Sequence, residues 1–363
     1  MIRFIDFLSY NASHVNFNSC ILNNCKIDDI HLSAESKHIE YVKDKLNKQI
    51  KSTSFVKGRA WKLLRDFYFL CELFKVKGTI KSKEPQLVIL GATGTQLFIL
   101  AFFLCLFPSK RQAIRLFFHS ELEFFDSKKG INKYFAKLAV KSMKLCNMIN
   151  TAVLSSHIKK NMVAESNDYE SVHLVRHPMP QFTEALFKKL SSNVMDKANL
   201  QLAVIGLLRG DTKNLDQAAA LRQLTNVNVN FFGRLGPDSS HIKLTESCQV
   251  LNEHYSDEWL RNCIKDVDFL LLSPAKNAYR FTALGTVSDS VLFSKPLIWE
   301  KHEAIQDYES YPLACVYHNV ADFNESLDKF EFPNFNVVSK WLEEWNELSK
   351  VELQQFLING SRV

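Results

Sequence analysis

Residues 200–213 read LQLAVIGLLRGDTK, an apolar run that ends in a loop with two glycines and two cations. The uninterrupted run Leu200–Ile205 predicts a strand buried on both faces, as in a parallel sheet that is covered by helices. A helical pattern follows at Leu215–Leu224, and a second apolar run, Val227–Phe232, ends at Gly233. Strand, helix and strand in this order predict a βαβ unit with a right-handed crossover.

The rest of the chain repeats this alternation. In the first half the spacing of apolar residues predicts helices from about Phe17, at Lys57–Lys77 and at Lys133–Met148, and strands at Met1–Phe7, Ile27–Leu32, Leu87–Leu90, Ala113–Phe118, Ala152–Ser155 and Ser171–Val175. In the second half it predicts strands at Phe269–Leu272 and Pro296–Trp299 and helices at Asp257–Cys263, Thr286–Phe293 and Lys340–Leu357. We therefore expect an α/β protein of two Rossmann-like domains that face a cleft.

Length and charge divide the chain near its middle. A chain of 363 residues suits two domains better than one, and a hydrophobic content of 46% excludes a disordered chain. Residues 1–180 hold 27 Lys and Arg against 15 Asp and Glu, a net charge of +12, whereas residues 181–363 hold 18 against 24, a net charge of −6. We predict a basic domain over 1–178, an acidic domain over 179–335, and a C-terminal helix, 336–363, that can cross back to the first domain.

Residues 87–107 are largely apolar and long enough to cross a bilayer. Gly91, Gly94 and the polar residues beside them interrupt this segment, so we favour a buried strand, a turn, and a buried helix over Gln96–Phe107 that Pro108 ends. The N-terminus does not resemble a signal peptide, because Asp6 interrupts its apolar stretch. Eight cysteines without C-x-x-C spacing indicate buried, reduced thiols in a cytosolic protein.

Two loops of the second half carry residue types that bind phosphate. Ligands of open α/β sheets bind beyond the carboxyl ends of the strands. Arg209 and Lys213 follow the strand Leu200–Ile205, where their cations would neutralise phosphate oxygens, although an exposed polar turn has the same composition. The loop that begins at Ser273 is long and polar, and it includes Arg280.

That loop ends at Gly285 and Thr286, where a predicted helix begins. A helix N-terminus offers free N–H groups to an anion, although Thr286 can equally be a simple cap of the helix. Ser288 and Asp289 lie in the first turn, where Asp289 can accept hydrogen bonds from ribose hydroxyls or complement the helix dipole.

This order of features resembles the nucleotide-sugar domain of GT-B-fold glycosyltransferases, in particular the family-4-like bacterial enzymes of polysaccharide and lipopolysaccharide assembly. It comprises Gly206…Lys213 after a strand, a strand that ends at Gly233, Asp268-x-x-x-x-Ser273-Pro274, and a helix before Lys295-Pro296-Leu297-Ile298. The resemblance implies that Arg209 and Lys213 grip the donor diphosphate. It also implies that Asp289 is the second acid of the family's E-x7-E element, whose first acid would fall at Phe281 and is missing.

The resemblance assigns roles in the first half as well, although there it is one of architecture only. GT-B enzymes often carry a histidine after a strand of the N-terminal domain, and His119 follows the strand Ala113–Phe118. His119 would hydrogen-bond the transferred sugar or act as a base. Glu121 and Glu123 are alternative acids, and His14, in the loop after the first strand, is a second candidate base. A structural role remains open for each.

Two other patterns carry weaker expectations. Asp266-Val267-Asp268 matches the metal-binding D-x-D motif, but it precedes an apolar strand, so we expect no metal site and no cofactor beyond the nucleotide-sugar. The predicted helix Lys133–Met148 carries a lysine stripe, Lys133, Lys137, Lys141 and Lys144. The stripe is either a solvated face or a surface that docks on anionic lipid headgroups, which would make the protein cytoplasmic and peripheral on the inner membrane.

Taken with the resemblance, these features predict a metal-independent glycosyltransferase. The donor would be UDP- or GDP-linked, and the acceptor a glycan or a lipid-linked sugar in bacterial surface polysaccharide assembly, such as lipopolysaccharide or capsule. The alternatives are a sugar-nucleotide epimerase of the same fold, an inactive partner subunit, and a nucleic-acid-binding protein. We expect no nucleic-acid partner, because the second half is acidic.

Overall fold

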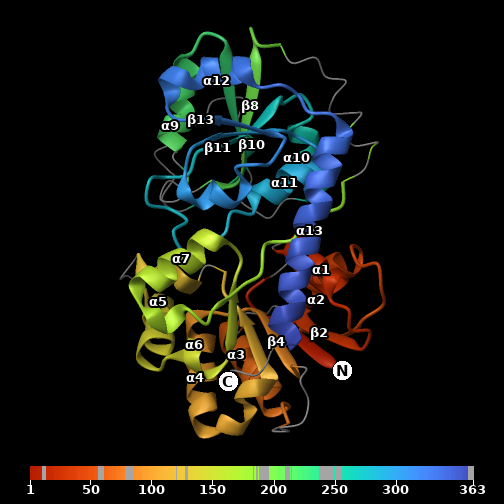
Figure 1. Ribbon diagram of the computed structural model, residues 1–363. Coiled ribbons are helices and arrows are strands. Elements are labelled where there is room, and N and C mark those ends of the chain that lie inside the picture. Colours follow the sequence, from red (N-terminus) through yellow and green to blue (C-terminus); the bar gives the residue numbers. More distant parts are fainter. Residues whose placement is uncertain are drawn as a thin grey trace. The chain divides into compact units, whose positions relative to one another are not determined.

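Two parallel sheets, one in each half of the chain, form the framework of the computed structural model (Figure 1). The structure describes residues 1–9, 14–55, 61–77, 85–119, 121–126, 130–182, 184, 187, 196–208, 213, 215–236, 249–250 and 256–358. Unit 1 comprises Met1–Pro178, Arg280–Ala283 and Asn346–Val363, and unit 2 comprises Met179–Tyr279 and Leu284–Trp345. The chain therefore passes from one unit to the other between Pro178 and Met179.

Within the described residues, unit 1 holds a seven-stranded sheet in the order β3-β2-β1-β4-β5-β6-β7, with every neighbouring pair parallel. Its strands are β1 (Ile2–Asp6), β2 (Ile30–Glu35), β3 (Lys51–Phe55), β4 (Leu87–Gly91), β5 (Ile114–Phe117), β6 (Asn150–Val153) and β7 (His173–Leu174). Its helices are α1 (Val15–Asn24), α2 (Ser36–Lys43), α3 (Trp61–Phe74), α4 (Gly94–Leu106), α5 (Ile131–Lys137), α6 (Leu145–Met148) and α7 (Ser156–Glu165).

Each face of this sheet has its own apolar core. One core packs Ile89 of β4 against α3, α4 and α5, and the other packs Val88 of β4 against α1, α2 and the end of the last helix, α13 (Phe335–Ile358). Neighbouring residues of a strand point to opposite faces, so a strand that is buried on both sides is apolar at every position. This explains the uninterrupted apolar runs of the sequence.

Unit 2 is built in the same way, with described strands in the order β10-β9-β8-β11-β12-β13, all parallel. The strands are β8 (Leu200–Leu208), β9 (Val227–Leu235), β10 (Gln249–Val250), β11 (Phe269–Leu272), β12 (Leu297–Glu300) and β13 (Ala314–Tyr317). The helices are α9 (Leu215–Ala220), α10 (Asp257–Cys263), α11 (Thr286–Phe293), α12 (Phe323–Lys329) and the first half of α13, which ends in unit 1. Apolar clusters again lie on both faces of the sheet.

The α/β architecture is confirmed, and the predicted bounds of α10, α11 and β11 agree with the structure. The predicted helix Lys133–Met148 is wrong as a single element. It is divided into α5, one wide turn at Leu138–Ser142, and α6, because Lys144 takes a left-handed conformation with φ 51°. The strands β3, β10 and β13 were not predicted; each is an outer strand of its described sheet.

Residues 87–107 form the strand β4, a turn and the helix α4, as expected. A capping box at Thr93 and Gln96 fixes the start of α4, since each side chain bonds the backbone N–H of the other residue. No helix in the described part of the chain is long and apolar enough to cross a membrane. The expectation that α4 is wholly buried is wrong, because Phe102, Cys105 and Leu106 are exposed.

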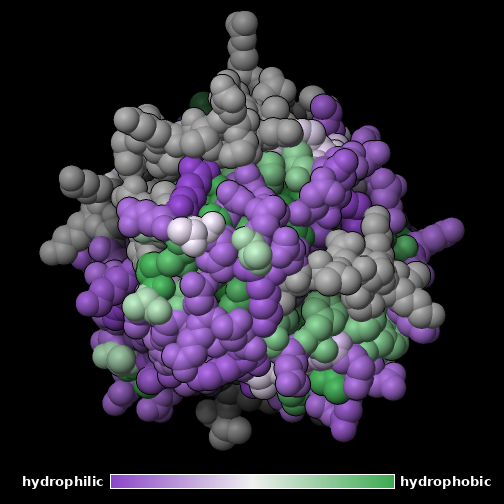
Figure 2. All heavy atoms as spheres, turned by 90° about the horizontal axis from the view of Figure 1, so that it is seen from above, coloured by the Kyte–Doolittle hydropathy of each residue, from purple (hydrophilic) through white to green (hydrophobic). Residues whose placement is uncertain are grey.

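Figure 2 shows one face of the molecule, on which hydrophilic side chains predominate and hydrophobic ones form small separate groups. Single exposed apolar side chains of this kind are normal on a globular protein. Larger groups of exposed apolar residues on other helices therefore require a separate explanation.

Gly206 of β8 and Gly233 of β9 lie opposite each other in the sheet of unit 2. A Cβ atom on Gly233 would stand 1.9 Å from the carbonyl oxygen of Gly206, and Gly233 has a φ of +146°. Glycine is required there both by the space and by the backbone conformation.

We predict that Gly233→Ala lowers the free energy of unfolding by about 2–4 kcal/mol, because the added Cβ collides with backbone that cannot move aside. Urea unfolding followed by circular dichroism measures this change. Gly285→Ala is the matched control, since a Cβ there meets no atom within 4 Å, and it should shift stability by less than about 0.5 kcal/mol. Equal effects of the two substitutions would contradict the prediction.

Candidate functional site

In each unit the strand order reverses between two central strands, β1 and β4 in unit 1 and β8 and β11 in unit 2. At such a point the loops after the two strands leave in opposite directions, and a crevice opens beyond their carboxyl ends. The segments that follow these four strands are therefore the places to look for a site, one in each unit.

Lys213 lies at the reversal point of unit 2. Its backbone pairs with that of Pro274, which follows β11, so the loops after β8 and β11 are joined there. Its ammonium group donates a hydrogen bond to the carbonyl oxygen of Ile205 in β8. The pocket that these residues line with Tyr279 and Thr286 measures about 10 Å³, roughly the volume of one water molecule.

Burial lowers the pKa of Lys213 to about 8, and the negative charge of Asp289 opposes this shift. Among the described residues, the hydrogen-bond partner of this cation is a neutral carbonyl. A cation that is partly withdrawn from water beside few compensating groups is typical of a site that binds an anion.

The N-terminus of α11 borders the same pocket through Thr286. The cap position is held by exposed Gly285, which provides no side-chain bond, so Thr286 does not cap the helix. Ser288 instead donates its hydroxyl hydrogen to the Gly285 carbonyl at 2.6 Å. The first N–H groups of a helix have no partner within it, so this terminus adds positive potential beside Lys213.

The other predicted donor-site residues lie elsewhere or cannot be placed. Arg209 lies outside the described residues. Arg280 belongs to unit 1, where it pairs with Asp126 at 2.9 Å, and Asn161 donates to its carbonyl oxygen. The next residue, Phe281, is buried in the core of unit 1 and stacks on Phe125 with ring centroids 4.6 Å apart. Phe281, where the resemblance places the first acid of the E-x7-E element, is thus a core residue of unit 1.

In unit 1 the reversal point is occupied by a buried carboxylate, Asp6, the last residue of β1. One oxygen accepts the backbone N–H groups of Leu8 and Ser9, and the other accepts the amide of Asn18 at 2.6 Å. Asn18 also contacts a ring nitrogen of His38 at 2.8 Å. Burial would raise the pKa of Asp6, but the neighbouring imidazoles and these hydrogen bonds outweigh it and lower the pKa.

Histidines from separate loops meet beside this carboxylate. The ring of His119, which follows β5, lies 4.8 Å from that of His14 and 4.6 Å from that of Phe17. The ring of His177, which follows β7, lies 5.2 Å from the ring of Phe17, a residue of α1. Burial lowers the pKa of His119 to about 3 and that of His177 to about 4, so both rings are neutral at physiological pH.

Glu121 connects the loops after β4 and β5. One of its oxygens accepts the backbone N–H of Ala92, and the other accepts that of His119 at 2.6 Å. Burial raises its pKa to about 7. The carboxyl group thus positions His119 directly. Glu123 lies nearby on the surface, where it pairs with Lys133 and accepts a hydrogen bond from Thr282.

Four residues of this cluster of carboxylates and histidines were not predicted from the sequence as members of a site: Asp6, Asn18, His38 and His177. Asp6 ends a strand, a position that could have marked it, whereas Asn18 and His38 lie within helical patterns and carry no signal of their own. Loops that follow neighbouring parallel strands come together, and this rule alone places His14 and His119 on one edge.

The weaker patterns have structural partners. Asp268 accepts the backbone N–H of Gln201 at 2.8 Å, at the amino end of β11. Three lysines of the predicted stripe pair with acids, Lys133 with Glu123, Lys141 with Glu165 and Lys144 with Asp168. In the described part of the chain, no group of three or more His, Cys, Asp or Glu side chains is placed to hold a metal ion.

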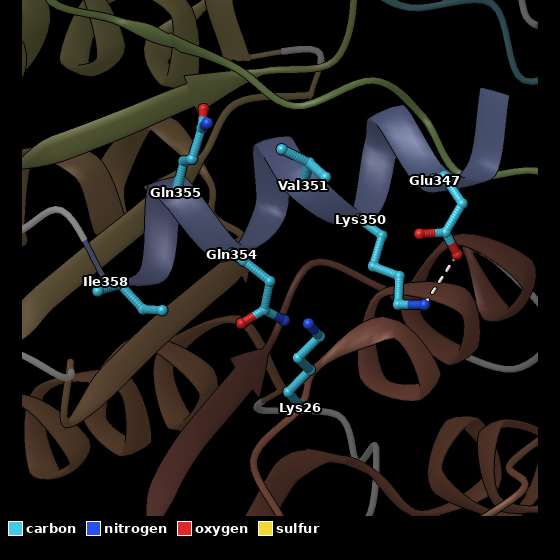
Figure 3. A pocket seen from close by; sticks show the side chains of 7 residues that line it. All are labelled: Lys26, Glu347, Lys350, Val351, Gln354, Gln355 and Ile358. Carbon is cyan, nitrogen blue, oxygen red and sulfur yellow. Dashed lines mark hydrogen bonds and ion pairs between the residues drawn. The ribbon is translucent and has the colours of Figure 1, made fainter. Parts of the chain in front are cut away.

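A larger hollow, of about 230 Å³, lies along α13 in unit 1 (Figure 3). Lys350 and Glu347 pair there at 2.9 Å, and Gln354 donates to the carbonyl oxygen of Asn24. Lys26 lines the same hollow and precedes β2, so this hollow is at the amino end of that strand. Ligands of such sheets bind at the opposite edge, so we do not take this hollow as the active site.

No protein-family model matches the chain, and no curated protein sequence does. Solved structures are similar to it along its whole length. HepE of Anabaena in complex with UDP has a TM-score of 0.58 at 12% identity and covers 98% of this chain and 97% of its own. The UDP-forming trehalose-phosphate synthase of Burkholderia xenovorans, in complex with glucose-6-phosphate, has a TM-score of 0.55 at 8% identity and covers 99% of each chain.

The N-terminal domain of Candida albicans trehalose-6-phosphate phosphatase is also similar, with a TM-score of 0.54 at 12% identity over 99% of this chain and 96% of its own. Sequence identities this low establish the fold and nothing finer. The chain has the GT-B fold, with two parallel-sheet units of the Rossmann type, as the sequence predicted.

We predict that Lys213→Met stabilises the ligand-free protein by about 1–2 kcal/mol at pH 7. Because the pKa of Lys213 is lowered, the folded protein binds the Lys213 proton less tightly than the unfolded chain does. The free energy of unfolding of wild type therefore rises between about pH 8 and 10.5, and the cost of burying the charged ammonium is complete below pH 8. Urea unfolding at pH 7 and pH 10 tests this, with the gain of the variant disappearing at the higher pH.

Lys295→Met is the matched control, because Lys295 is a buried lysine of the same unit that donates to the carbonyl oxygens of Lys265 and Val267. That substitution leaves two carbonyls without a donor and should destabilise the protein. A loss of stability in Lys213→Met as large as in Lys295→Met would show that Lys213 has only a structural role.

We predict that Phe281→Glu, which would supply the family's missing acid, destabilises unit 1 by more than about 3 kcal/mol. A carboxylate would replace a ring that stacks on Phe125 inside an apolar core. Thermal unfolding measures the loss, and Phe281→Leu, which keeps an apolar side chain, should lose clearly less. A Phe281→Glu variant as stable as wild type would refute the core assignment.

Proposed function

We propose that the protein is a glycosyltransferase that takes its sugar from a nucleoside-diphosphate donor bound in unit 2. The observation that carries this proposal is the half-buried Lys213 ammonium at the reversal point of the sheet, beside Asp289 and the N-terminus of α11. The GT-B fold supports the assignment, because HepE binds UDP and the Burkholderia xenovorans enzyme is UDP-forming. We therefore propose UDP as the first nucleotide to test and GDP as the second.

Binding a diphosphate would exchange the present partner of Lys213 for a better one. The ammonium would leave the neutral carbonyl of Ile205 and pair with an anion, so part of the cost of its burial would be recovered. The backbone N–H groups at the start of α11 would receive the second phosphate, and the Asp289 carboxylate would accept ribose hydroxyls. Arg209, four residues before Lys213 in the sequence, would add a second cation.

The same groups would assist the chemical step. When the bond between the sugar carbon C1 and the diphosphate oxygen breaks, the electron pair and the negative charge go to the diphosphate. Lys213 and the dipole of α11 would stabilise that charge as it develops, so we propose a reaction without a metal ion. The acceptor hydroxyl oxygen forms the new bond to C1, and its proton goes to a base.

Unit 1 would supply the acceptor side. His119 is neutral at physiological pH and bonds the Leu90 carbonyl, so it suits a hydrogen-bonding role toward sugar hydroxyls better than that of a base. His14 is exposed and its ring lies 4.8 Å from that of His119, which leaves His14 as the candidate for receiving the proton, with Glu121 as the alternative. We propose a glycan or lipid-linked acceptor of the kind used in surface polysaccharide assembly.

A panel of nucleoside diphosphates tests the donor site. At about 100 times its dissociation constant a bound nucleotide adds roughly 2.7 kcal/mol, which raises the melting temperature by a few degrees. We expect the shift with UDP or GDP in wild type and in Lys265→Met, which removes a lysine at the opposite edge of the same sheet, but not in Lys213→Met. The shift should also weaken above pH 8, as Lys213 loses its proton.

Absence of a shift with every nucleotide, or a shift that Lys213→Met retains, would refute the donor site. If the shift is present, product analysis with the matching nucleotide-sugar separates the enzyme classes. Release of the nucleoside diphosphate that increases with added acceptor supports transfer, whereas a change of the sugar without any release identifies an epimerase and overturns the proposal.

A further inference from the structure

Exposed apolar side chains gather on one side of unit 1, on the helices α3, α4 and α5. On α3 the residues Leu63, Phe67 and Phe74 follow each other at spacings of four and seven and are exposed, Phe67 by 60%. Such spacing places them on one face of the helix. Their exposure is unusual, because residues of this size normally face the core.

The helix α4 lies between the other two and has no charged residue along its length, GTQLFILAFFLCL. Its inner side packs Leu97, Leu100 and Leu104 into the core, and its outer side exposes Phe102, by 53%, and Leu106. A helix that is apolar all round is normally covered on every side. The outer side of α4 has no such cover in the described part of unit 1.

Ring contacts join the three helices into one surface. Phe74 of α3 lies 5.4 Å from Phe103 of α4, and Phe98 of α4 lies 5.1 Å from Phe135 of α5, centroid to centroid. The neighbour of Phe135, Tyr134, is exposed, as is Ile131 at the start of α5. The exposed side chains thus belong to three helices that pack side by side, and we call them together the apolar face.

Cations outnumber acids in the described residues of these helices. Lys62, Lys75, Lys77 and Lys137 are exposed on or just after α3 and α5. The Lys110 ammonium, just after α4, lies within 5.9 Å of the ring centroids of Phe74, Phe103 and Phe107. Over the described residues of α3, α4, α5 and the turn 108–113, the acids are Asp66 and Glu72. Asp66 pairs with Arg65, and Glu72 is buried against Arg3 and Lys75.

We propose that the apolar face docks unit 1 on the surface of an anionic phospholipid membrane. The aromatic and aliphatic side chains would enter the boundary between headgroups and acyl chains, and the surrounding lysines would pair with lipid phosphates. This combination of an apolar centre and a basic rim is the chemistry that such a surface recognises. The purpose of docking rests on the proposed function, since it would bring the enzyme to an acceptor carried on a lipid.

A second copy of the chain fits the apolar face less well. In a two-fold dimer the same surface meets itself, so the basic rim of one copy would face the basic rim of the other. Like charges placed opposite each other at the edge of an apolar contact oppose association. The membrane surface, which is anionic, has the complementary charge.

Flotation with lipid vesicles tests the proposal on the full chain. We expect wild type to float with vesicles of phosphatidylcholine and phosphatidylglycerol mixed in equal parts, and much less with phosphatidylcholine alone. The double variant Phe67→Glu, Phe102→Glu should bind at least about tenfold more weakly, since both carboxylates would have to enter the membrane boundary. Lys62→Glu should lower binding by about fivefold or more, and high salt should lower it further.

The matched control is Leu348→Glu, Val351→Glu on α13, where both side chains are also half exposed, by 51% and 50%. This variant should float like wild type, and circular dichroism with thermal melting should show all three variants folded. Failure of wild type to float, equal binding by Phe67→Glu, Phe102→Glu, or equal loss in the control would overturn the proposal. A dimer in sedimentation analysis that only the Phe67→Glu, Phe102→Glu variant abolishes, without flotation of wild type, would assign the face to a second copy.

The nucleotide-induced melting shift, measured on the same variants, separates this proposal from the function on which its purpose rests. Flotation without any nucleotide binding would refute the donor site and leave the docking face standing. Nucleotide binding that persists in a wild type that does not float would refute the docking face alone.

Discussion

Both sheets are buried on both faces, and this constraint decides where polar chemistry can lie. The strands β4 and β11 are apolar at every position because apolar cores pack on them from two sides. A charged side chain within such a strand would be buried without a partner. The polar groups of the protein therefore collect beyond the carboxyl ends of the strands, with Asp6 and His119 in unit 1 and Lys213 in unit 2.

The two edges hold their polar groups in opposite ways. In unit 1, Asp6 accepts three hydrogen bonds, and Glu121 accepts two, so the carboxyl groups are satisfied and the rings beside them are neutral. In unit 2, the hydrogen-bond partner of the Lys213 ammonium among the described residues is a neutral carbonyl, and the pKa of Lys213 is lowered. Carboxyl groups that are satisfied and rings that are neutral suit hydroxyl groups, whereas an under-compensated cation suits a phosphate anion. This difference in electrostatics is the one on which the proposed sugar transfer relies.

The sequence predicts what local signals determine and misses what distant contacts determine. It gives α10 and α11 to the residue, because Ser256 caps one helix and an apolar pattern defines the other, and β11 is an unbroken apolar run. The strand β3, KSTSF, is polar and pairs on one side only, so nothing local distinguishes it from a loop. Arg280 was assigned to the donor loop because of its place in the sequence, but the burial of Phe281 draws it into unit 1. Asn18 and His38 contact Asp6 or its neighbours through helix positions that no spacing rule marks.

The outer side of the helix α4 shows a second limit of structure prediction from the sequence. An apolar sequence without charges predicts burial, and the sheet, α3 and α5 cover three sides of this helix. The remaining side would be compatible with polar residues, because Phe102 and Leu106 contribute little to the core while they are exposed. The fold therefore does not require aromatic and aliphatic residues there, whereas a surface that enters another apolar phase does. The apolar sequence of α4 indicates that the helix is covered on every side. It does not indicate whether this chain or another apolar phase provides the cover.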